Sequence, residues 1–385
     1  MALNLSSRHE LVRQSEIRNM SVECDRMGGI NLSQGISDLA VPKCVMMAAQ
    51  KAIEGGYNSY THFSGLEELR KAIAEKQKKY TGMDIDPENE IVVSAGSTGA
   101  FYCACLALLN PGDEVILFEP YYGYHKTTLV AAGAVPVYVR LSPPEWTFTD
   151  ESLESVVSGK TRGILINTPA NPSGKVFSKE ELDRIAEFAS NYDLFVFTDE
   201  IYEHFLYDGK EHIAPATIPG MRERTITISG LSKTFSITGW RIGYSICDPK
   251  WSRSIGYFND LIYVCAPSPL QMGVAKGLID LDKDFYQHIS QQFQRKRDMV
   301  CNSLREANLN PFVPEGAYYI LADISRIPGK SSNERCLYIL REIGVASVPG
   351  SAFYHDKSGE KLARFCFAKE DYVLSEACTR LKSLK

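Results

Sequence analysis

Short apolar runs alternate with helix-like stretches through most of the chain. Stretches with helical spacing lie between many of the runs, at Thr98–Leu109, Tyr124–Ala132 and Lys179–Ser190. Strands that alternate with helices are typical of a mainly parallel sheet covered by helices on both faces. The pattern therefore predicts an α/β fold with a seven-stranded sheet. Its strands are expected at Ile91–Val93, Val115–Phe118, Val135–Val139, Gly163–Ile166, Leu194–Phe197, Thr225–Ile228 and Ile242–Ile246. The link between the last two is too short for a helical crossover, so one of that pair is expected to be antiparallel.

The C-terminal part of the chain shows a different order of elements. A long polar-rich helix is predicted at about 283–307, followed by the segment VPEGAYYILADI, a helix near 333–343, and strands at 346–348 and 362–366. This order favours a smaller α+β unit. The first 44 residues are expected to pack against it, because the large sheet begins well after them. We therefore expect a large domain at 46–282 and a small domain made of 1–45 and 283–385.

Composition and charge narrow the class of protein and its expected location. In 385 residues, 44% are apolar and 23% are charged, which is ordinary for a globular protein. The net charge of −5 does not favour a nucleic-acid or membrane partner. The N-terminal stretch MALNLSSRHELVRQ lacks the apolar core of a signal peptide, and no later run is long enough to cross a bilayer. Ten cysteines are scattered singly without a C-x-x-C pair, which indicates reduced thiols rather than a metal site. We expect a cytoplasmic protein.

The segment ITISGLSKTFSITGWRIG at 226–243 holds the most informative chemistry. A β-branched run ends in Ser229-Gly230, and Lys233 follows in a turn of small residues. Burial favours the neutral amine, which attacks carbonyls and forms Schiff bases. Arg241, eight residues later, is positioned to meet an anion such as a phosphate. Pyridoxal 5′-phosphate (PLP) carries an aldehyde and a phosphate on one molecule. The alternative is a plain strand-turn-strand with a snorkelling lysine.

Ligands of open α/β sheets bind beyond the carboxyl ends of the strands, so the residues after each apolar run are candidates. A small-residue turn at 94–100 opens a helix whose N-terminus suits a phosphate. Tyr122 follows the second run and offers a ring for stacking. Asn171 lies in a turn rigidified by prolines, where its amide can donate to a ring oxygen. Each feature also has a structural alternative, namely a tight turn, a core tyrosine or a surface turn.

A carboxylate, Asp199, stands at the end of the fifth run. Burying it is costly unless it pairs with a cation, and a protonated pyridine nitrogen would be such a partner. Tyr202, three residues after Asp199, can lie at the same strand end and donate a hydrogen bond to the ring oxygen of PLP. The alternative is an Asp that caps the next helix. Taken together, the groups at five strand ends suit one molecule of PLP.

Four motifs carry a family resemblance: NPSG at Asn171–Gly174, TDEIY at Thr198–Tyr202, SKTF at Ser232–Phe235 and TGWRIGY at Thr238–Tyr244. From about Asn31 to the C-terminus the chain resembles the class I/II aminotransferases, PLP enzymes of fold type I. It is similar to the branch that contains aspartate, kynurenine and methionine aminotransferases. The resemblance implies the PLP-transferase fold type I, with a large PLP-binding domain and a smaller α+β domain.

The resemblance also assigns roles to single residues. Lys233 holds the cofactor as a Schiff base and acts as the general base, and Asp199 pairs with the pyridine nitrogen. The other cofactor contacts that it implies are Tyr202 and Asn171 at the ring oxygen, Tyr122 on the ring face, and Gly96, Ser97, Thr98 and Arg241 at the phosphate.

Substrate and partner contacts follow from the same resemblance. Arg364 and Asn171 would bind the substrate, with Arg364 clamping the α-carboxylate and the backbone of Gly35 nearby. Tyr60 would reach the phosphate in the neighbouring subunit, which implies a homodimer with a shared active site.

The implied activity is transamination of EC 2.6.1 type, in which an L-amino acid (aspartate, aromatic or other) and a 2-oxo acid such as 2-oxoglutarate react in a ping-pong sequence. Thr98 stands where enzymes that prefer aspartate often carry a lysine, so the amino donor stays open. A tyrosine-rich pocket would admit apolar or aromatic side chains. The alternatives are a PLP-dependent β-C–S lyase, a lyase similar to aminocyclopropane-carboxylate synthase, and a non-catalytic scaffold. A transcription regulator is not expected, because the N-terminal segment leaves no room for a DNA-binding domain.

Overall fold

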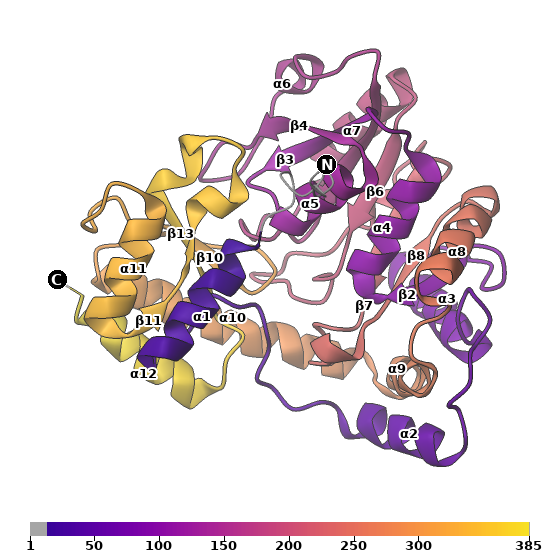
Figure 1. Cartoon of the computed structure of the whole chain (residues 1–385), viewed down its shortest axis with the longest axis horizontal. Helices are drawn as coiled ribbons and strands as arrows, with labels where there is room; N and C mark the ends of the chain where they lie inside the picture. Colours follow the sequence, from indigo (N-terminus) through magenta and orange to yellow (C-terminus); the bar gives the residue numbers. More distant parts are fainter. Residues whose placement is uncertain (1–13, 385) are drawn as a thin grey trace, which may run out of the picture.

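The computed structural model describes residues 14–384. The predicted lack of a signal peptide rests on residues outside this range. Seven strands form one sheet in the order β2-β8-β7-β6-β5-β3-β4 (Figure 1). Their bounds are Ile91–Ala95 (β2), Glu114–Glu119 (β3), Val135–Arg140 (β4), Thr161–Asn167 (β5), Phe195–Asp199 (β6), Thr225–Gly230 (β7) and Ile242–Ile246 (β8). All seven predicted strands are thus confirmed.

The sheet is mainly parallel, as predicted. Strands β4, β3, β5, β6 and β7 run parallel to one another, whereas β8 is antiparallel to both β7 and β2. The antiparallel strand is the one that follows the short link after β7, because a link without a long helix cannot return the chain to the starting edge.

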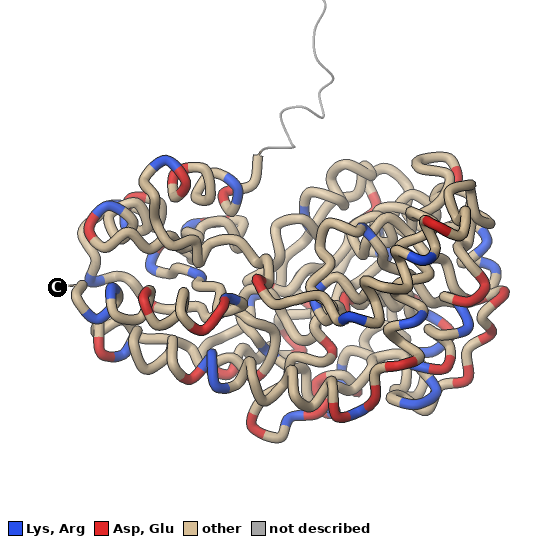
Figure 2. Tube along the Cα trace, turned by 90° about the horizontal axis from the view of Figure 1, so that it is seen from below, with Lys and Arg blue, Asp and Glu red and all other residues tan. Residues whose placement is uncertain are grey.

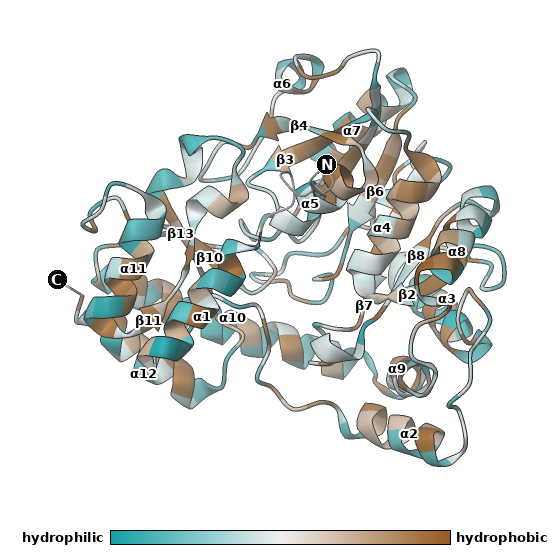
Figure 3. Ribbon diagram, viewed as in Figure 1, coloured by the Kyte–Doolittle hydropathy of each residue, from teal (hydrophilic) through white to brown (hydrophobic). Residues whose placement is uncertain are grey.

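Helices cover both faces of this sheet because side chains alternate between the faces along each strand. Val115 and Leu117 of β3 pack with Phe101 in one buried cluster. Their neighbour Ile116 packs with Leu182 in another. The first cluster lies under α4 (Gly96–Leu108), α5 (Gly123–Ala132) and α8 (Pro249–Tyr263), and the second under α7 (Lys179–Asn191). Figure 3 shows the corresponding apolar colouring of the strands and of the helix faces turned toward them.

The C-terminal part forms a second sheet in the order β12-β13-β10-β9. Its strands are Val348–Pro349 (β12), Leu362–Cys366 (β13), Tyr319–Asp323 (β10) and Asn310–Phe312 (β9), and all its pairs are antiparallel. The long helix α10 (Lys283–Glu306) packs on α12 (Asp371–Lys382), and α11 (Ser332–Ile343) packs on β12. The predicted helices and the strand at 362–366 are confirmed.

The predicted strand at 346–348 is divided in the structure. β11 (Val345–Ala346) pairs with β1 (Ile30–Asn31), whereas β12 pairs with β13. The chain changes its pairing partner at Ser347, whose buried hydroxyl donates to the sulfur of Cys336 at 3.3 Å.

The N-terminal segment lies against the C-terminal part, as Figure 1 shows for the indigo helix α1 (Glu16–Met27) beside α11 and α12. Ile30 of β1 is in register with Val345, and α1 contacts both β11 and β12. The exact domain bounds at 45/46 and 282/283 remain a prediction.

The remaining helices lie around the edge formed by β2. α2 (Lys43–Glu54) packs closely on α9 (Ser268–Asp280), and α3 (Glu67–Thr81) contacts α9 and β2. Short elements complete the chain: α6 (Asp150–Glu154) and the 3-10 turns η2 (Pro215–Thr217), η3 (Thr238–Trp240), η4 (Gly350–Phe353) and η5 (Lys357–Lys361). Acidic and basic positions are interspersed along the trace in Figure 2. Within residues 14–384, no helix has the length and apolar character needed to span a bilayer.

Candidate active site

A cavity of about 360 Å³ lies at the carboxyl ends of the strands of the large sheet. Strand β2 leads into it through the start of α4, β5 through the turn after Asn167, β6 through Asp199, and β7 through the turn that carries Lys233. The sequence-predicted residues that line it are Ser97, Thr98, Tyr122, Asn171, Asp199, Tyr202, Lys233 and Arg241. The fold thus gathers residues from 97 to 241 into one place, as the strand-end argument predicted.

Lys233 is half-buried in the turn after β7. Its Nζ donates to the carbonyl oxygen of Gly35 at 3.3 Å. Burial lowers the pKa of the amine from 10.5 to about 8, since desolvation disfavours the charged form. A substantial neutral fraction is therefore present near physiological pH, and the neutral amine is the nucleophilic form.

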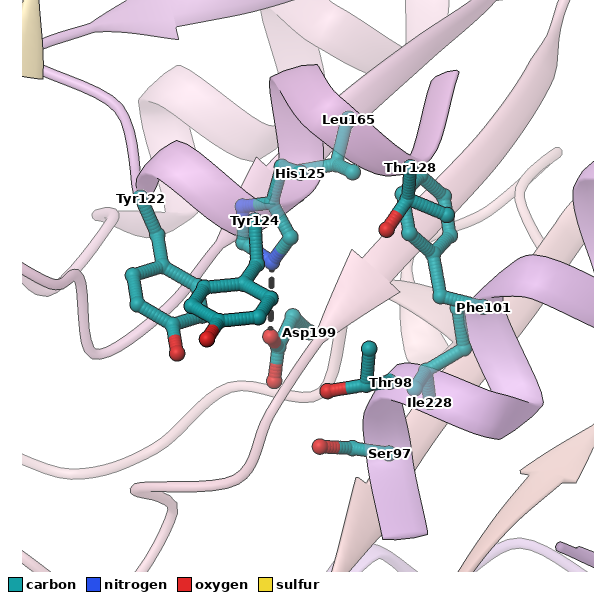
Figure 4. Close-up of a pocket in the computed structure, with 10 residues that line it drawn as sticks. All are labelled: Ser97, Thr98, Phe101, Tyr122, Tyr124, His125, Thr128, Leu165, Asp199 and Ile228. Carbon is teal, nitrogen blue, oxygen red and sulfur yellow. Dashed lines mark hydrogen bonds and ion pairs between the residues drawn. The ribbon is translucent and has the colours of Figure 1, made fainter. Parts of the chain in front are cut away.

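Asp199 ends β6 and is held by a histidine from a different element. Nε2 of His125, in the first turn of α5, lies 2.8 Å from Oδ2 of Asp199, and both side chains are buried (Figure 4). The backbone N–H of Ile201 donates to the other carboxylate oxygen at 3.2 Å. These two bonds fix the direction in which the carboxylate faces the cavity.

Aromatic rings form the walls of the cavity. Tyr122 lies over Tyr124 with their ring centroids 5.3 Å apart, and the two stacked rings are visible in Figure 4. The hydroxyl of Tyr202, which also lines the cavity, lies 2.9 Å from that of Tyr319. Burial raises the pKa of Tyr202 well above its usual value, so its hydroxyl stays protonated and can donate a hydrogen bond.

An anion cradle is formed at the N-terminus of α4. The helix begins at Gly96, which has φ of +75°, and a Cβ there would lie 2.3 Å from Nη2 of Arg241. Arg241 donates to the carbonyls of Thr238 at 2.9 Å and Ala95 at 3.4 Å, and it forms no ion pair with a carboxylate in the described part of the chain. The free backbone N–H groups of Ser97 and Thr98 add the positive end of the helix dipole.

Arg364, on β13, is only 1% exposed and yet lacks a carboxylate partner among residues 14–384. Its Nη1 donates to Oδ1 of Asn171 at 2.9 Å and its Nη2 to the carbonyl of Ser33 at 2.6 Å, but its Nε has no hydrogen-bond partner there. A buried guanidinium without a counter-ion is costly. The arrangement is suited to an anion that arrives with a ligand. Considered alone in the sequence, this residue suggested only a surface charge.

Gly35 lies where a side chain would not fit. A Cβ at this position would come within 1.8 Å of the Tyr319 hydroxyl oxygen, and the Gly35 carbonyl accepts from Tyr318 at 3.0 Å as well as from Lys233. The backbone at Gly35 thus lines a second cavity, of about 200 Å³, together with Lys233 and Arg364.

Two candidates, Gly96 and Tyr60, do not line either cavity; Gly96 lies beside Arg241, whereas Tyr60 lies apart from the site. Tyr60 is the exposed one. Its side chain is 81% exposed, in the segment between α2 and α3. The neighbouring residues hold that segment against the C-terminal end of α8 and the start of α9, through Ser59 with Ser268 and Thr61 with Cys265.

The residues that were not found from the sequence include His125, which holds Asp199, and Tyr319 and Arg18, which line a cavity. His125 carried a usable signal, since it stands in the first turn of a predicted helix directly after a strand end. Tyr319 and Arg18 come from the C-terminal part and the N-terminal helix, and nothing local in the sequence connects them with the large sheet.

The chain matches the family model for aminotransferase class I and II over residues 28–381. The chain belongs to this family. It is 36% identical to a kynurenine–oxoglutarate transaminase of Dictyostelium discoideum, covering 94% of this chain and 92% of the relative. It is also 36% identical to an aspartate aminotransferase of Pyrococcus abyssi, covering 99% and 98%. The aminotransferase superimposes on the N-succinyldiaminopimelate aminotransferase of Mycobacterium tuberculosis with a TM-score of 0.95, at 35% identity over 99% of this chain and 100% of the other.

Members of this family use PLP, and the cavity of the aminotransferase suits that cofactor. The missing side chain of Gly96 lets the guanidinium of Arg241 lie against the start of α4, so that a phosphate could meet the arginine and the helix N-terminus together. The Asp199 carboxylate faces the cavity, and Lys233 brings an amine whose pKa is lowered to about 8. These groups match the phosphate, the pyridine nitrogen and the aldehyde of PLP. The predicted family, fold, cofactor and aminotransferase activity between amino acids and 2-oxo acids are thus confirmed.

Proposed function

We propose that this aminotransferase works by a ping-pong sequence in which Lys233, Asp199, Tyr202 and Arg364 have the roles that the family resemblance implies. Support comes above all from Arg364, a fully buried guanidinium whose Nε lacks a partner in the described residues. It shares a cavity with Lys233, the one amine that lines it. A ligand whose carboxylate binds Arg364 and whose amino group lies near Lys233 has the two groups of an α-amino acid.

PLP, when bound, supplies an aldehyde for the amino group and a ring that takes up the electrons released at Cα. Lys233 contributes a neutral amine that accepts the Cα proton at Nζ and returns a proton to the product side. Asp199, oriented by His125, keeps a proton on the ring nitrogen. Arg364 would hold the α-carboxylate by parallel N–H donors, in the cavity that Lys233 also lines.

A screen of half-reactions tests this function. Each L-amino acid is mixed with the PLP-loaded enzyme without a 2-oxo acid, and the cofactor absorbance and the products are followed. Transamination converts the cofactor once and releases one equivalent of 2-oxo acid. Continuous release of pyruvate and ammonia without an acceptor would instead identify a β-C–S lyase. Formation of aminocyclopropane carboxylate from an amino acid with a γ-sulfonium leaving group, added to the same screen, would identify the second lyase alternative. Borohydride reduction followed by peptide mapping should place the label on Lys233.

We also propose a homodimer in which Tyr60 enters the partner's site. Tyr60 is 81% exposed, and Leu261 near the end of α8 is 79% exposed on the neighbouring surface. Exposed tyrosine and leucine side chains of this size are common at interfaces between subunits. Light scattering should give a mass of two chains; a monomer at micromolar concentration that retains full activity would contradict the shared site.

A cytoplasmic location and the division into a large domain (46–282) and a small domain (1–45 and 283–385) complete the proposal. The ten cysteines are all free, and eight of them are buried, as expected in a reducing compartment. Five of the buried ones lie within the core that also contains residues of β10 and β13: Cys24, Cys301, Cys336, Cys366 and Cys378.

A further inference from the structure

Arg18 is an arginine of the N-terminal helix α1 that lines the substrate cavity. It contributes to the 360 Å³ cavity that holds Asp199 and Arg241 and to the 200 Å³ cavity that holds Arg364. Lys233 also lines both cavities. Helix α1 belongs to the side of the molecule opposite the large sheet (Figure 1), where it contacts β11 and β12.

Arg18 is exposed near the start of α1. It forms neither an ion pair nor a side-chain hydrogen bond with any residue from 14 to 384. The other arginine on the same helix is different, because Nη1 of Arg26 lies 2.6 Å from a carboxylate oxygen of Glu23. Arg26 therefore has a counter-ion next to it on the helix, and Arg18 does not.

Of the four cations that line the two cavities, three would have a partner on PLP or on the α-carboxylate of an amino acid. The cations are Arg18, Lys233, Arg241 and Arg364, and the one carboxylate is Asp199, bonded to His125. PLP would occupy Arg241 through its phosphate, Lys233 through its aldehyde and Asp199 through its ring nitrogen. The α-carboxylate of any amino acid would occupy Arg364. One cation, Arg18, is left over.

Polar groups accompany Arg18 in the smaller cavity. Ser15, Gln34, Tyr124 and Thr238 line it along with the arginine and offer hydroxyl and amide groups, next to the apolar side chains of Ile17 and Ile36. An apolar or aromatic side chain of a substrate would leave the arginine unpaired there, whereas a carboxylate would accept from it.

We propose that Arg18 binds the distal carboxylate of the substrate, and that this aminotransferase acts on dicarboxylic amino acids and 2-oxo acids. The inference rests on the proposed function, because it takes Arg364 as the site of the α-carboxylate. It also accounts for Thr98: the cation that recognises the second carboxylate is on α1, and none is needed beside the phosphate.

Ligand binding to the PLP-loaded enzyme tests the inference apart from turnover. Calorimetric titration with glutarate, which has two carboxylates, is compared with titration with butyrate, which has one. Loss of a charge-assisted hydrogen bond should weaken glutarate binding roughly ten- to hundredfold in R18Q, with butyrate within about twofold of wild type. R18K should recover part of the loss, and R26Q, the matched control on the same helix, should bind both ligands as wild type does.

Half-reaction rates supply the second readout. R18Q should lower the rate constant for glutamate or aspartate by a similar factor and leave that for methionine unchanged. Equal weakening of glutarate and butyrate, an unchanged glutarate affinity, or a loss of PLP itself from R18Q would overturn the inference. The proposed function fails separately: wild-type enzyme that converts no amino acid, but binds glutarate in an Arg18-dependent way, would contradict transamination and leave the anion site standing.

Discussion

Arg364 shows at the scale of one residue how a site is kept ready for its ligand. Its side chain is buried with two neutral acceptors, Asn171 and Ser33, and an Nε without a partner in the described chain. Substitution by lysine keeps the charge but removes the planar fork of donors. We expect R364K to raise KM for every amino acid about tenfold or more, because one of two charge-assisted bonds is lost.

The measurement for R364K is the concentration dependence of the half-reaction with one dicarboxylic and one neutral amino acid. Both should be affected equally, since both carry an α-carboxylate. PLP affinity should not change, because Arg364 does not line the cavity at the phosphate. A variant that loses only the dicarboxylic substrate would place the distal carboxylate at Arg364 and contradict the assignment.

The lowered pKa of Lys233 makes the stability of the cofactor-free protein depend on pH. The folded state holds the amine at a pKa of about 8, whereas the unfolded chain keeps it near 10.5. Between these values the unfolded state binds more protons, so the contribution of this group to stability rises with pH. K233M removes the buried charge. We expect the variant to be more stable than wild type at pH 7, and this advantage to shrink as pH rises from about 8 toward 10.5.

Urea unfolding of the two cofactor-free proteins at a series of pH values checks this prediction. The difference between the two unfolding free energies cancels the contributions of tyrosines and cysteines that titrate in the same pH range. A difference in unfolding free energy that stays constant with pH would mean that the amine is not desolvated in the folded protein.

Single residues were predictable where a strand end supplied them. Lys233, Asp199 and Asn171 each follow an apolar run directly, so the sequence connects the chemistry to an edge of the sheet. His125 acts through Asp199, 74 positions away, and its role depends on how α5 packs beside β6. Arg18 depends on a contact between the N-terminal helix and the C-terminal sheet, which no local pattern encodes.

At the scale of elements, the start of α4 depends on a glycine. Gly96 has φ of +75° and its missing Cβ leaves room for Arg241, whose Nη2 would lie 2.3 Å from such an atom. Gly112, before β3, has φ of +90° with no atom within 4 Å of a Cβ. G96A and G112A therefore share the backbone strain, but only G96A displaces the arginine. We expect G96A to weaken PLP binding about tenfold beyond any effect of G112A.

Equilibrium dialysis of PLP, with thermal unfolding as a control, distinguishes these variants. Both should lower the melting temperature, because both place a side chain at positive φ. Equal PLP affinity in G96A and G112A would show that Arg241 moves aside without cost and that the cradle does not depend on its position.

Whole elements were more predictable than their connections. The seven strands of the large sheet were found from their apolar runs because a strand buried on both faces has a continuous apolar sequence. The break at Ser347 was missed, since a change of pairing partner leaves the alternation of side chains intact. The pairing of β1 with β11 brings together positions 30 and 345, and it follows from the packing of the N-terminal helix rather than from either strand.

At the scale of the whole molecule, Tyr60 connects the site to a second subunit in our proposal, because its ring is exposed and lines neither cavity of its own chain. If it completes the partner's site, an active site needs Lys233 from one chain and Tyr60 from the other. Y60A and K233A homodimers should then both be impaired. A mixed dimer contains one site with both substitutions and one site with neither, so mixing the two impaired proteins should restore activity.

Denaturing and refolding an equimolar mixture should yield half of the dimers as hybrids. Each hybrid has one intact site of two, so the mixture should show about a quarter of the wild-type activity. Activity that stays at the average of the two variants would assign Tyr60 to its own chain or to no site at all.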